Sequence, residues 1–276
     1  MKIFKLNKYI LLLVFLVLLD CCIGTFVGIW RDWYWSAISD KHFGLWMKYI
    51  AEFIVAALLS CGVSGYSSYL ISVISLTWRT KLTRKALKLD YRRVEGHQQR
   101  IQEDCGRYPS LLLSLSVGLL RSLIMIVAFS FIILQHVSWY YLLIPFGYAM
   151  IGTLVAGKIA FPLINLNYMN QVVEARFRQS LSRLNYLLAH NNNHKLFIKT
   201  KHLNYFQSFF SQITVIFPHL CLASLYFSGK IVFGVFMQVA AAMAEITSSL
   251  SVILLSFSDI NNLISCHRRL RELRIV

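Results

Sequence analysis

Six apolar stretches, each long enough to cross a lipid bilayer, alternate along the chain with polar segments of unequal length. About 20 residues of helix cross the hydrocarbon core of a bilayer, so runs of this length predict membrane-spanning helices. The expected spans cover about residues 9–30, 49–77, 111–134, 138–161, 209–227 and 231–257. We therefore expect an all-α membrane protein in which residues 1–276 form a single transmembrane domain.

The polar segments between these spans are in turn short, long, short, long and short. The two long ones cover about residues 78–110 and 162–208. The first opens with WRTKLTRKALKLDYRR, which lacks proline and glycine and therefore suits a helix. We expect each long segment to form a helical hairpin outside the bilayer, the first turning near Gly96 and re-entering near Pro109.

Basic residues are distributed unevenly between the two sides of this arrangement. Of 28 lysines and arginines, 22 lie in the amino terminus, the two long segments and the carboxyl-terminal tail. Cytoplasmic loops carry the excess of basic residues, so both termini and both long segments are predicted to be cytoplasmic. The net charge of +16 is then explained by membrane topology, and we expect no nucleic-acid partner. Asp20 before Cys21 is unsuited to signal-peptide cleavage, which predicts an uncleaved first span.

Motifs for catalysis, metal binding or nucleotide binding are weak in this chain. GTLVAGKI (152–159) has isoleucine where a phosphate-binding loop needs Ser or Thr, and it lies in an apolar span. The six cysteines form no CxxC pair, and HNNNH (190–194) lacks a catalytic glutamate. We expect no enzymatic activity, cofactor or metal site. The chain ends about 19 residues after the last expected span, so we also expect no ATPase domain in it.

Three ionisable residues fall within the expected spans: Asp20, Arg121 and Glu245. Charged side chains are costly in lipid and often mark transport pathways or partners. Because carboxylates in a low-dielectric environment take up protons more readily than in water, these residues are our candidates for proton coupling. The alternative is that Asp20 or Glu245 forms a structural ion pair with Arg121. Gly24 and Gly28 form a GxxxG pattern, which permits close approach of a neighbouring helix.

Two separate segments, in the right order, resemble the SbmA/BacA family. WRTKLTRKALKLDYRRVEGHQQRIQED is similar to the family's WRT followed by EGxxQRxQED. NQVVEARFRQSLSRL resembles its NQRVEAxYRxxL stretch after the fourth span, and the closing SCHRRLREL is similar to its final basic element. The likeness runs from about Gly24 to the end, and the six spans with two hairpins also resemble the transmembrane half of ABC exporters.

The resemblance implies a homodimer in the inner membrane of Gram-negative bacteria that imports peptide antibiotics and other peptides, driven by the proton gradient. It also implies that a set of motif residues holds the cytoplasmic hairpins together and closes the inward side of the cavity. These residues are Glu95, Gln98, Gln99, Arg100, Gln102, Glu103, Asp104, Gln171, Glu174 and Arg178.

Two departures from the family pattern leave alternatives open. The amino-terminal sequence that precedes the first span in proton-driven members has no counterpart, and NYLLAHNNNH replaces an expected acidic stretch. In the second respect the chain is similar to related ATP-driven transporters. It is then either the transmembrane subunit of a transporter with a separately encoded ATPase, or an inactive truncated member or membrane assembly partner.

Overall fold

A computed structural model describes residues 3–88, 97–158, 186–252 and 256–272, and every regular element in these ranges is helical. Six helices are long and apolar enough to cross a membrane, which confirms the all-α class and the expected number of spans. Five are α1 (Ile3–Ser39), α2 (Phe43–Ala86), α3 (His97–His136), α5 (Tyr186–Phe227) and α6 (Phe233–Leu250). The sixth span, Trp139–Lys158, begins with the 3-10 helix η1 (Trp139–Leu142). A shorter helix, α8 (Phe257–Glu272), follows α6.

Several helix ends differ from the apolar runs that predicted them. The first helix continues to Ser39, so only Asp40–His42 separate it from α2, with Lys41 at a left-handed φ of 57°. Helix α6 ends at Leu250, within the last apolar run. Pro109 lies inside α3, which begins at His97. Apolar runs mark where lipid ends, whereas a helix continues into water as long as its backbone stays hydrogen-bonded and its side chains pack.

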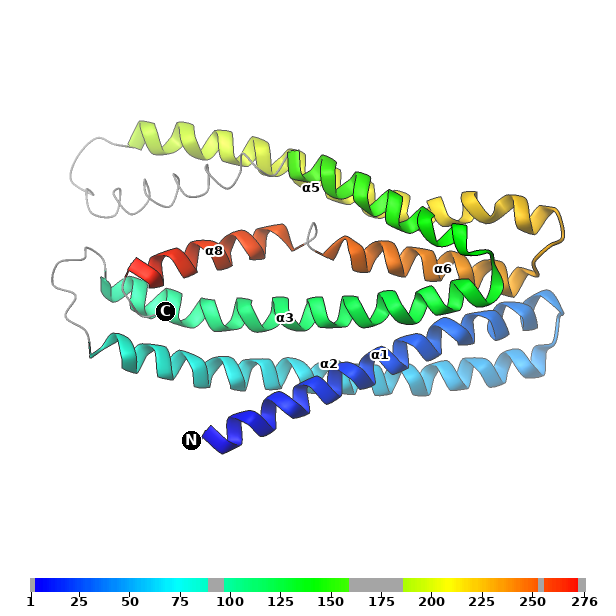
Figure 1. The fold of residues 1–276 in the computed structure, drawn as a ribbon, viewed down its shortest axis with the longest axis horizontal. Helices are drawn as coiled ribbons and strands as arrows, with labels where there is room; N and C mark the ends of the chain where they lie inside the picture. The colour runs from blue at the N-terminus through cyan, green and yellow to red at the C-terminus, as the bar shows by residue number, and fades with distance from the viewer. Residues whose placement is uncertain (1–2, 89–96, 159–185, 253–255, 273–276) are drawn as a thin grey trace.

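Helices α1, α2, α3 and α6 form one bundle, in which α1 begins and α8 ends at the same end (Figure 1). The largest buried cluster joins α1, α3 and α6 through residues such as Cys21, Phe129 and Ile246. The GxxxG pattern lies at the contact between α1 and α3: a Cβ atom on Gly28 would come within 2.7 Å of a Phe129 ring carbon. The predicted close approach is therefore made, and it is made to α3.

The span Trp139–Lys158 and α5 pack on each other and lie apart from α1 and α2 (Figure 1). The Tyr148 ring stacks on Phe210 and Phe217, and its hydroxyl donates a hydrogen bond of 3.1 Å to the Phe210 carbonyl oxygen. Gly152 lies directly against the Phe210 ring. This pair of helices, the α5 arm, contacts the bundle through α6.

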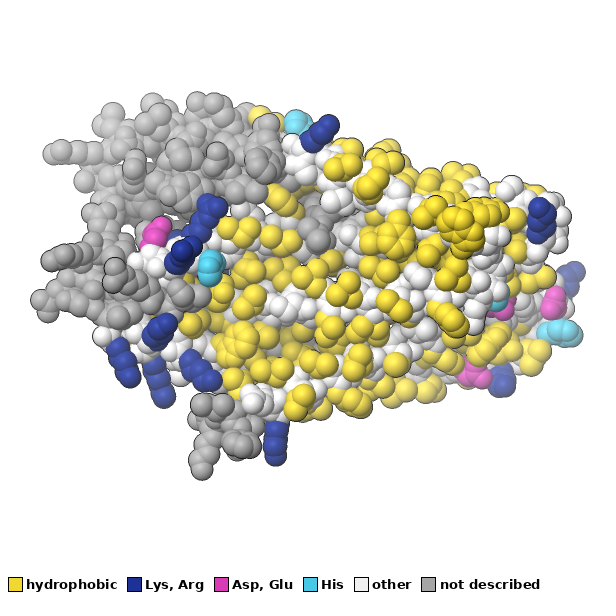
Figure 2. All heavy atoms as spheres, viewed as in Figure 1, with side chains coloured by type: hydrophobic (Ala, Val, Ile, Leu, Met, Phe, Trp, Pro, Cys, Tyr) yellow, Lys and Arg dark blue, Asp and Glu magenta, His cyan; other side chains and the backbone are white. Residues whose placement is uncertain are grey.

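An apolar band covers the middle of the molecule, and charged side chains gather at its two ends (Figure 2). Helix α2, with 44 residues, is about 66 Å long at about 1.5 Å per residue. That is roughly twice the 30 Å hydrocarbon thickness of a bilayer, so α2 extends well beyond the lipid. Arg84 and Lys85 lie in its last turn, at the end where α1 begins.

Candidate functional site

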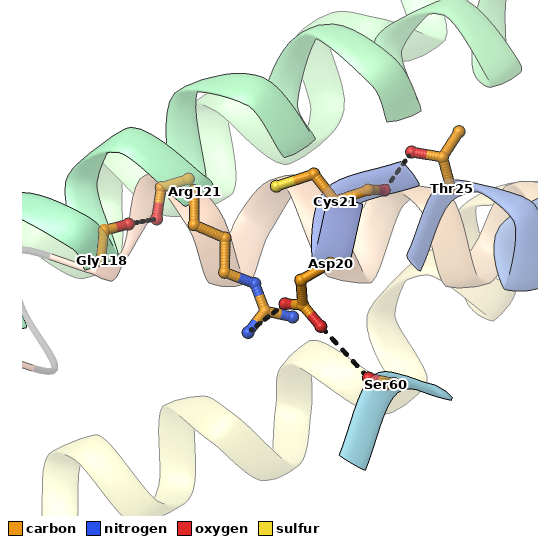
Figure 3. Close-up of polar contacts among 7 residues, drawn as sticks. Asp20, Cys21, Thr25, Ser60, Gly118 and Arg121 are labelled. Carbon is orange, nitrogen blue, oxygen red and sulfur yellow. Dashed lines mark hydrogen bonds and ion pairs between the residues drawn. The ribbon is translucent and has the colours of Figure 1, made fainter. Parts of the chain in front are cut away.

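Asp20 and Arg121 form an ion pair between α1 and α3 in the middle of the bundle (Figure 3). Arg121 Nη1 lies 3.4 Å from Asp20 Oδ2. Ser60 of α2 donates a hydrogen bond of 3.1 Å from its hydroxyl to Asp20 Oδ1. A carboxylate in a membrane span is costly unless its charge is compensated, and here two neighbouring helices supply the compensation. Asp20 therefore links three helices.

The two partners of this pair differ in exposure. The Asp20 side chain is 14% exposed, whereas that of Arg121 is 52% exposed. Arginines in membrane spans face the bundle interior, a water-filled cavity or a partner, because hydrocarbon does not solvate a guanidinium. The open side of Arg121 is therefore expected to face water or another protein surface.

Glu245 lies on α6, close to this ion pair. Its carboxylate is near enough to the Cys21 thiol to act on it electrostatically, as are Asp20 and Arg121. Met243 and Ile246, on either side of it, belong to the buried cluster of α1, α3 and α6. Within the described part of the chain, the Glu245 carboxylate has no hydrogen bond or ion pair. The structure thus gathers all three predicted ionisable residues in one region, and it pairs Arg121 with Asp20.

A second polar site lies at the end of the bundle where α1 begins and α8 ends. Asp104 on α3 is 3% exposed and binds the guanidinium of Arg269 on α8. Arg269 donates from Nε to Oδ2 at 2.8 Å and from Nη2 to Oδ1 at 2.7 Å. Two parallel charge-assisted hydrogen bonds make this a strong and directional contact. We call this pair the α3–α8 clasp.

Apolar and aromatic contacts surround the clasp. Cys105 and Leu270 are fully buried in a cluster that also includes Ala86 of α2. The Tyr108 ring stacks on the His267 ring at 5.7 Å between centroids. Arg79 of α2 donates a hydrogen bond of 3.4 Å to the main-chain oxygen of Gln102. The ends of α2, α3 and α8 are therefore packed together around the Asp104 carboxylate.

The electrostatics of the clasp follow from its burial. Burial lowers the pKa of Arg269, but the hydrogen bonds and charge of Asp104 outweigh this effect and raise that pKa above its ordinary value. Burial also raises the pKa of the Cys266 thiol to about 11, with the nearby Asp104 carboxylate adding to the effect. Arg269 therefore stays charged and Cys266 stays a neutral thiol at physiological pH.

The other predicted motif residues are only partly covered by the structure. Glu95, Gln171, Glu174 and Arg178 lie outside the described residues. Gln98, Gln99 and Arg100 are in the first turn of α3, but the structure does not describe their side chains. The side chains of Gln102 and Glu103 are exposed. Of the ten motif residues, Asp104 is therefore the one whose side chain the structure describes as buried.

Arg269 is the residue that sequence reasoning missed. Asp104 is bound by a residue 165 positions away, which helical spacing within α3 does not reveal. The closing segment SCHRRLREL contained the relevant signal, because its basic residues follow the last span and so return to the same end as α3. Among the described residues, no group of three or more His, Cys, Asp or Glu side chains could hold a metal ion.

Comparison with known proteins finds the same family that the sequence motifs resemble. The sequence profile of the SbmA/BacA-like family matches residues 7–276. The chain belongs to the SbmA/BacA-like family. With six described helices long and apolar enough to cross a bilayer, this family member has the architecture of a multi-pass membrane protein.

Relatives of this SbmA/BacA-like chain are named as ABC transporters. "ABC transporter D family member 2, chloroplastic" of Arabidopsis thaliana is 25% identical over 88% of the chain and 39% of its own length. "Inner membrane ABC transporter ATP-binding protein YddA" of Escherichia coli is 23% identical over 97% of the chain and 57% of its own length. The SbmA/BacA-like chain therefore spans roughly half the length of these relatives.

Proposed function

We propose that this chain forms the transmembrane domain of a homodimeric transporter that carries peptides inward, driven by protonation of Glu245. The observation that carries the proposal is a carboxylate in a spanning helix with no ion-pair partner among the described residues, beside a paired Asp20 and Arg121. An intramembrane ionisable residue without a structural partner is a functional candidate. Orientation follows the basic residues, so both termini and the clasp face the cytoplasm.

Glu245 is a better candidate for proton coupling than Asp20. Arg121 compensates the charge of Asp20, and Ser60 donates a hydrogen bond to Asp20 Oδ1. Protonation of Asp20 would therefore break an existing ion pair. Protonating Glu245 would break no such contact and would remove an uncompensated charge from the bundle. Proton uptake by Glu245 therefore favours a bundle in which this carboxylate is buried, and proton release favours one in which it meets water.

Peptide transport is proposed from the family and supported by the surfaces that the structure leaves open. The α5 arm lies apart from α1 and α2 (Figure 1), and we propose that a second copy packs in this region. Arg121, half exposed, would then line the space between the copies. A cationic peptide moving inward also gains about 2.3 kcal/mol per charge from a membrane potential of 100 mV, which favours basic substrates.

We further propose that the cytoplasmic motif residues close the inward side of the cavity. Asp104 supports this role, since it holds the last turn of α8 against α3. Glu245 lies on α6, which precedes α8 in the chain, so a rearrangement of α6 on protonation is proposed to shift α8 and the clasp. Gln98, Gln99, Arg100, Gln102, Glu103 and the four motif residues outside the described ranges are proposed to act at the same end.

A second candidate is the transmembrane half of an ATP-driven transporter. It is favoured by two observations: the relatives named above are ABC transporters, and the chain covers 39% and 57% of their lengths. An ATPase on a separate subunit or on further sequence would then supply the energy. In that case Glu245 would have no part in energy coupling.

The deciding experiment measures accumulation of a fluorescent, proline-rich cationic peptide in proteoliposomes that contain the purified protein. An inward proton gradient is imposed and no ATP is present. Uptake that stops when a protonophore is added supports the proton-driven importer. No uptake from protein shown to be folded and dimeric removes that proposal and favours the ATP-driven alternative, which is then tested by adding an ATPase subunit and ATP.

A further inference from the structure

Helices α1 and α6 run antiparallel and touch along a seam in one half of the bundle. At one end, Gly234 of α6 lies directly against Asp32 and Ser36 of α1, and a Cβ atom there would collide with both. Further along, Glu245 lies close to Cys21. Eleven residues separate Gly234 from Glu245, and eleven separate Asp32 from Cys21, which is about 16 Å of helix on each side. The two helices therefore stay in register between these points.

Polar groups occupy this seam at intervals. Gly234, Gln238 and Glu245 are four and seven residues apart, so they share the face of α6 that meets α1. Asp32 and Thr25 are seven residues apart on the facing side of α1. The seam, defined by these five residues, lies in the half of the bundle that ends at the α1–α2 turn. The basic residues predict that this half faces outward.

Gln238 indicates that the seam holds a hydrogen-bond donor that the protein itself does not supply. Its side chain is 3% exposed, and its Oε1 has no hydrogen-bond partner in the described part of the chain. A buried amide oxygen without a partner is unfavourable, and buried polar groups of this kind are usually satisfied by an ordered water molecule. Such a water needs further polar partners. By helical spacing, Thr25 and the carboxylates of Asp32 and Glu245 fall on the same line of the two helices.

We propose that the seam holds a chain of water molecules that conducts protons from the outer face to Glu245. This inference rests on the proposed function and adds the route by which its coupling proton arrives. Gln238 lies about 6 Å below Gly234 and about 10 Å above Glu245, and Thr25 divides the longer interval. A proton enters at the Asp32 end, passes from water to water, and is taken up by the Glu245 carboxylate, which becomes neutral. Among the described residues, the titratable groups that act on Cys21 together with Glu245 are Asp20, Cys22 and Arg121, and Asp20 and Arg121 stay paired.

Two threonines provide a matched test of this route. Thr25 and Thr247 each donate a hydroxyl hydrogen bond to the carbonyl four residues earlier, at 2.8 and 2.9 Å. Thr25 lies in the seam, whereas Thr247 lies nine residues from Gln238, on the opposite face of α6. Gln238→Leu and Thr25→Val should each slow proton-driven peptide uptake about tenfold, because each removes one polar group that holds a water molecule in the chain. Thr247→Val should leave uptake unchanged.

A second readout detects the water directly and does not depend on transport. Hydroxyl radicals produced by X-ray radiolysis of water oxidise side chains next to ordered water, and mass spectrometry measures the extent at each residue. Cys21 lies beside Glu245 at the inner end of the seam, and Cys266 in the clasp is equally buried, each 2% exposed. Oxidation of Cys21, normalised to Cys266, should fall several-fold in Gln238→Leu and in Thr25→Val, and stay constant in Thr247→Val.

The two readouts separate failure of this inference from failure of the proposed function. Unchanged Cys21 oxidation in Gln238→Leu overturns the water chain, even if uptake proves to be proton-driven. If Cys21 oxidation falls but peptide uptake does not depend on the proton gradient, the seam contains water but does not conduct the coupling proton. That result would also contradict the proposed energy source. Equal loss of uptake in Thr25→Val and Thr247→Val would assign the effect to helix stability and would also overturn the proposal.

Discussion

Arg269 on α8 binds both carboxylate oxygens of Asp104 on α3, at 2.8 and 2.7 Å, across 165 residues of sequence. The Asp104 side chain is 4% exposed and that of Arg269 28% exposed, so little water competes for the contact. The pair joins the first of the family-like motifs to the last helix that the structure describes. This contact makes the clasp a structural unit whose loss can be measured.

Breaking the clasp should destabilise the protein strongly. Asp104→Asn and Arg269→Gln each leave a buried polar group without its charged partner, which costs about 3 kcal/mol for a pair at this depth. We expect both variants to lower the midpoint of thermal unfolding in detergent. Their effects should not add in the double variant, because each substitution removes the same contact.

The charge-reversed pair is the control for this prediction. Asp104→Arg combined with Arg269→Asp restores opposite charges and should recover part of the stability that either single reversal loses. If inward closure depends on the clasp, the reversed pair should also recover peptide uptake. Additive losses in the double variant, with no recovery on reversal, would contradict a direct energetic coupling between the two residues.

Substituting Glu245→Gln should abolish proton-driven uptake while leaving membrane levels and dimer formation intact. The amide keeps the size of the side chain but cannot bind and release a proton. Uptake is measured in proteoliposomes with an imposed gradient, and protein amount by immunoblotting. Unchanged uptake would remove Glu245 from the mechanism.

The Asp20 and Arg121 pair should behave differently from Glu245. Asp20→Asn leaves Arg121 without its counter-charge and should lower stability by about 1 kcal/mol, the usual size of polar contacts between membrane helices. Adding Arg121→Gln should recover most of the loss, because no unpaired charge then remains. Thermal unfolding in detergent measures both effects. A stability unchanged in Asp20→Asn would show that the ion pair contributes nothing.

The two glycines of the GxxxG pattern should differ in their tolerance of alanine. A Cβ atom at Gly28 would meet the rigid Phe129 ring at 2.7 Å, whereas one at Gly24 would meet the flexible end of Met125 at 2.8 Å. Gly28→Ala should therefore destabilise by about 1–3 kcal/mol, the range for overpacked cores, and Gly24→Ala by less. Comparison of their unfolding midpoints provides the test, and equal midpoints would count against rigid packing at Phe129.

The thiol of Cys266 should titrate at unusually high pH. Its pKa of about 11 in the folded protein lies above the ordinary value of 9.0, so alkylation by iodoacetamide should reach half its maximal rate near pH 11. In denaturing detergent the midpoint should return to about 9. Since folding raises this pKa, the neutral thiol is favoured in the folded state, and the free energy of unfolding should fall as pH rises from 9 to 11.

The sequence by itself determined the class of this protein, because lipid imposes a simple rule. A helix that crosses a bilayer needs about 20 apolar residues, and basic residues collect on one side. These two requirements act on composition and not on contacts, so the six spans could be counted without a structure. Asp20, Arg121 and Glu245 were found in the same way, as charges where lipid disfavours them.

The tertiary structure alone decided which charges meet. Arg121 pairs with Asp20 and not with Glu245, because the contact of α1 with α3 brings Asp20 within reach of Arg121. Asp104 binds Arg269, 165 positions away in the sequence, because α8 packs along α3 and covers the carboxylate. Such contacts depend on helix rotation and packing in three dimensions, and helical spacing within one segment carries no information about a partner on another.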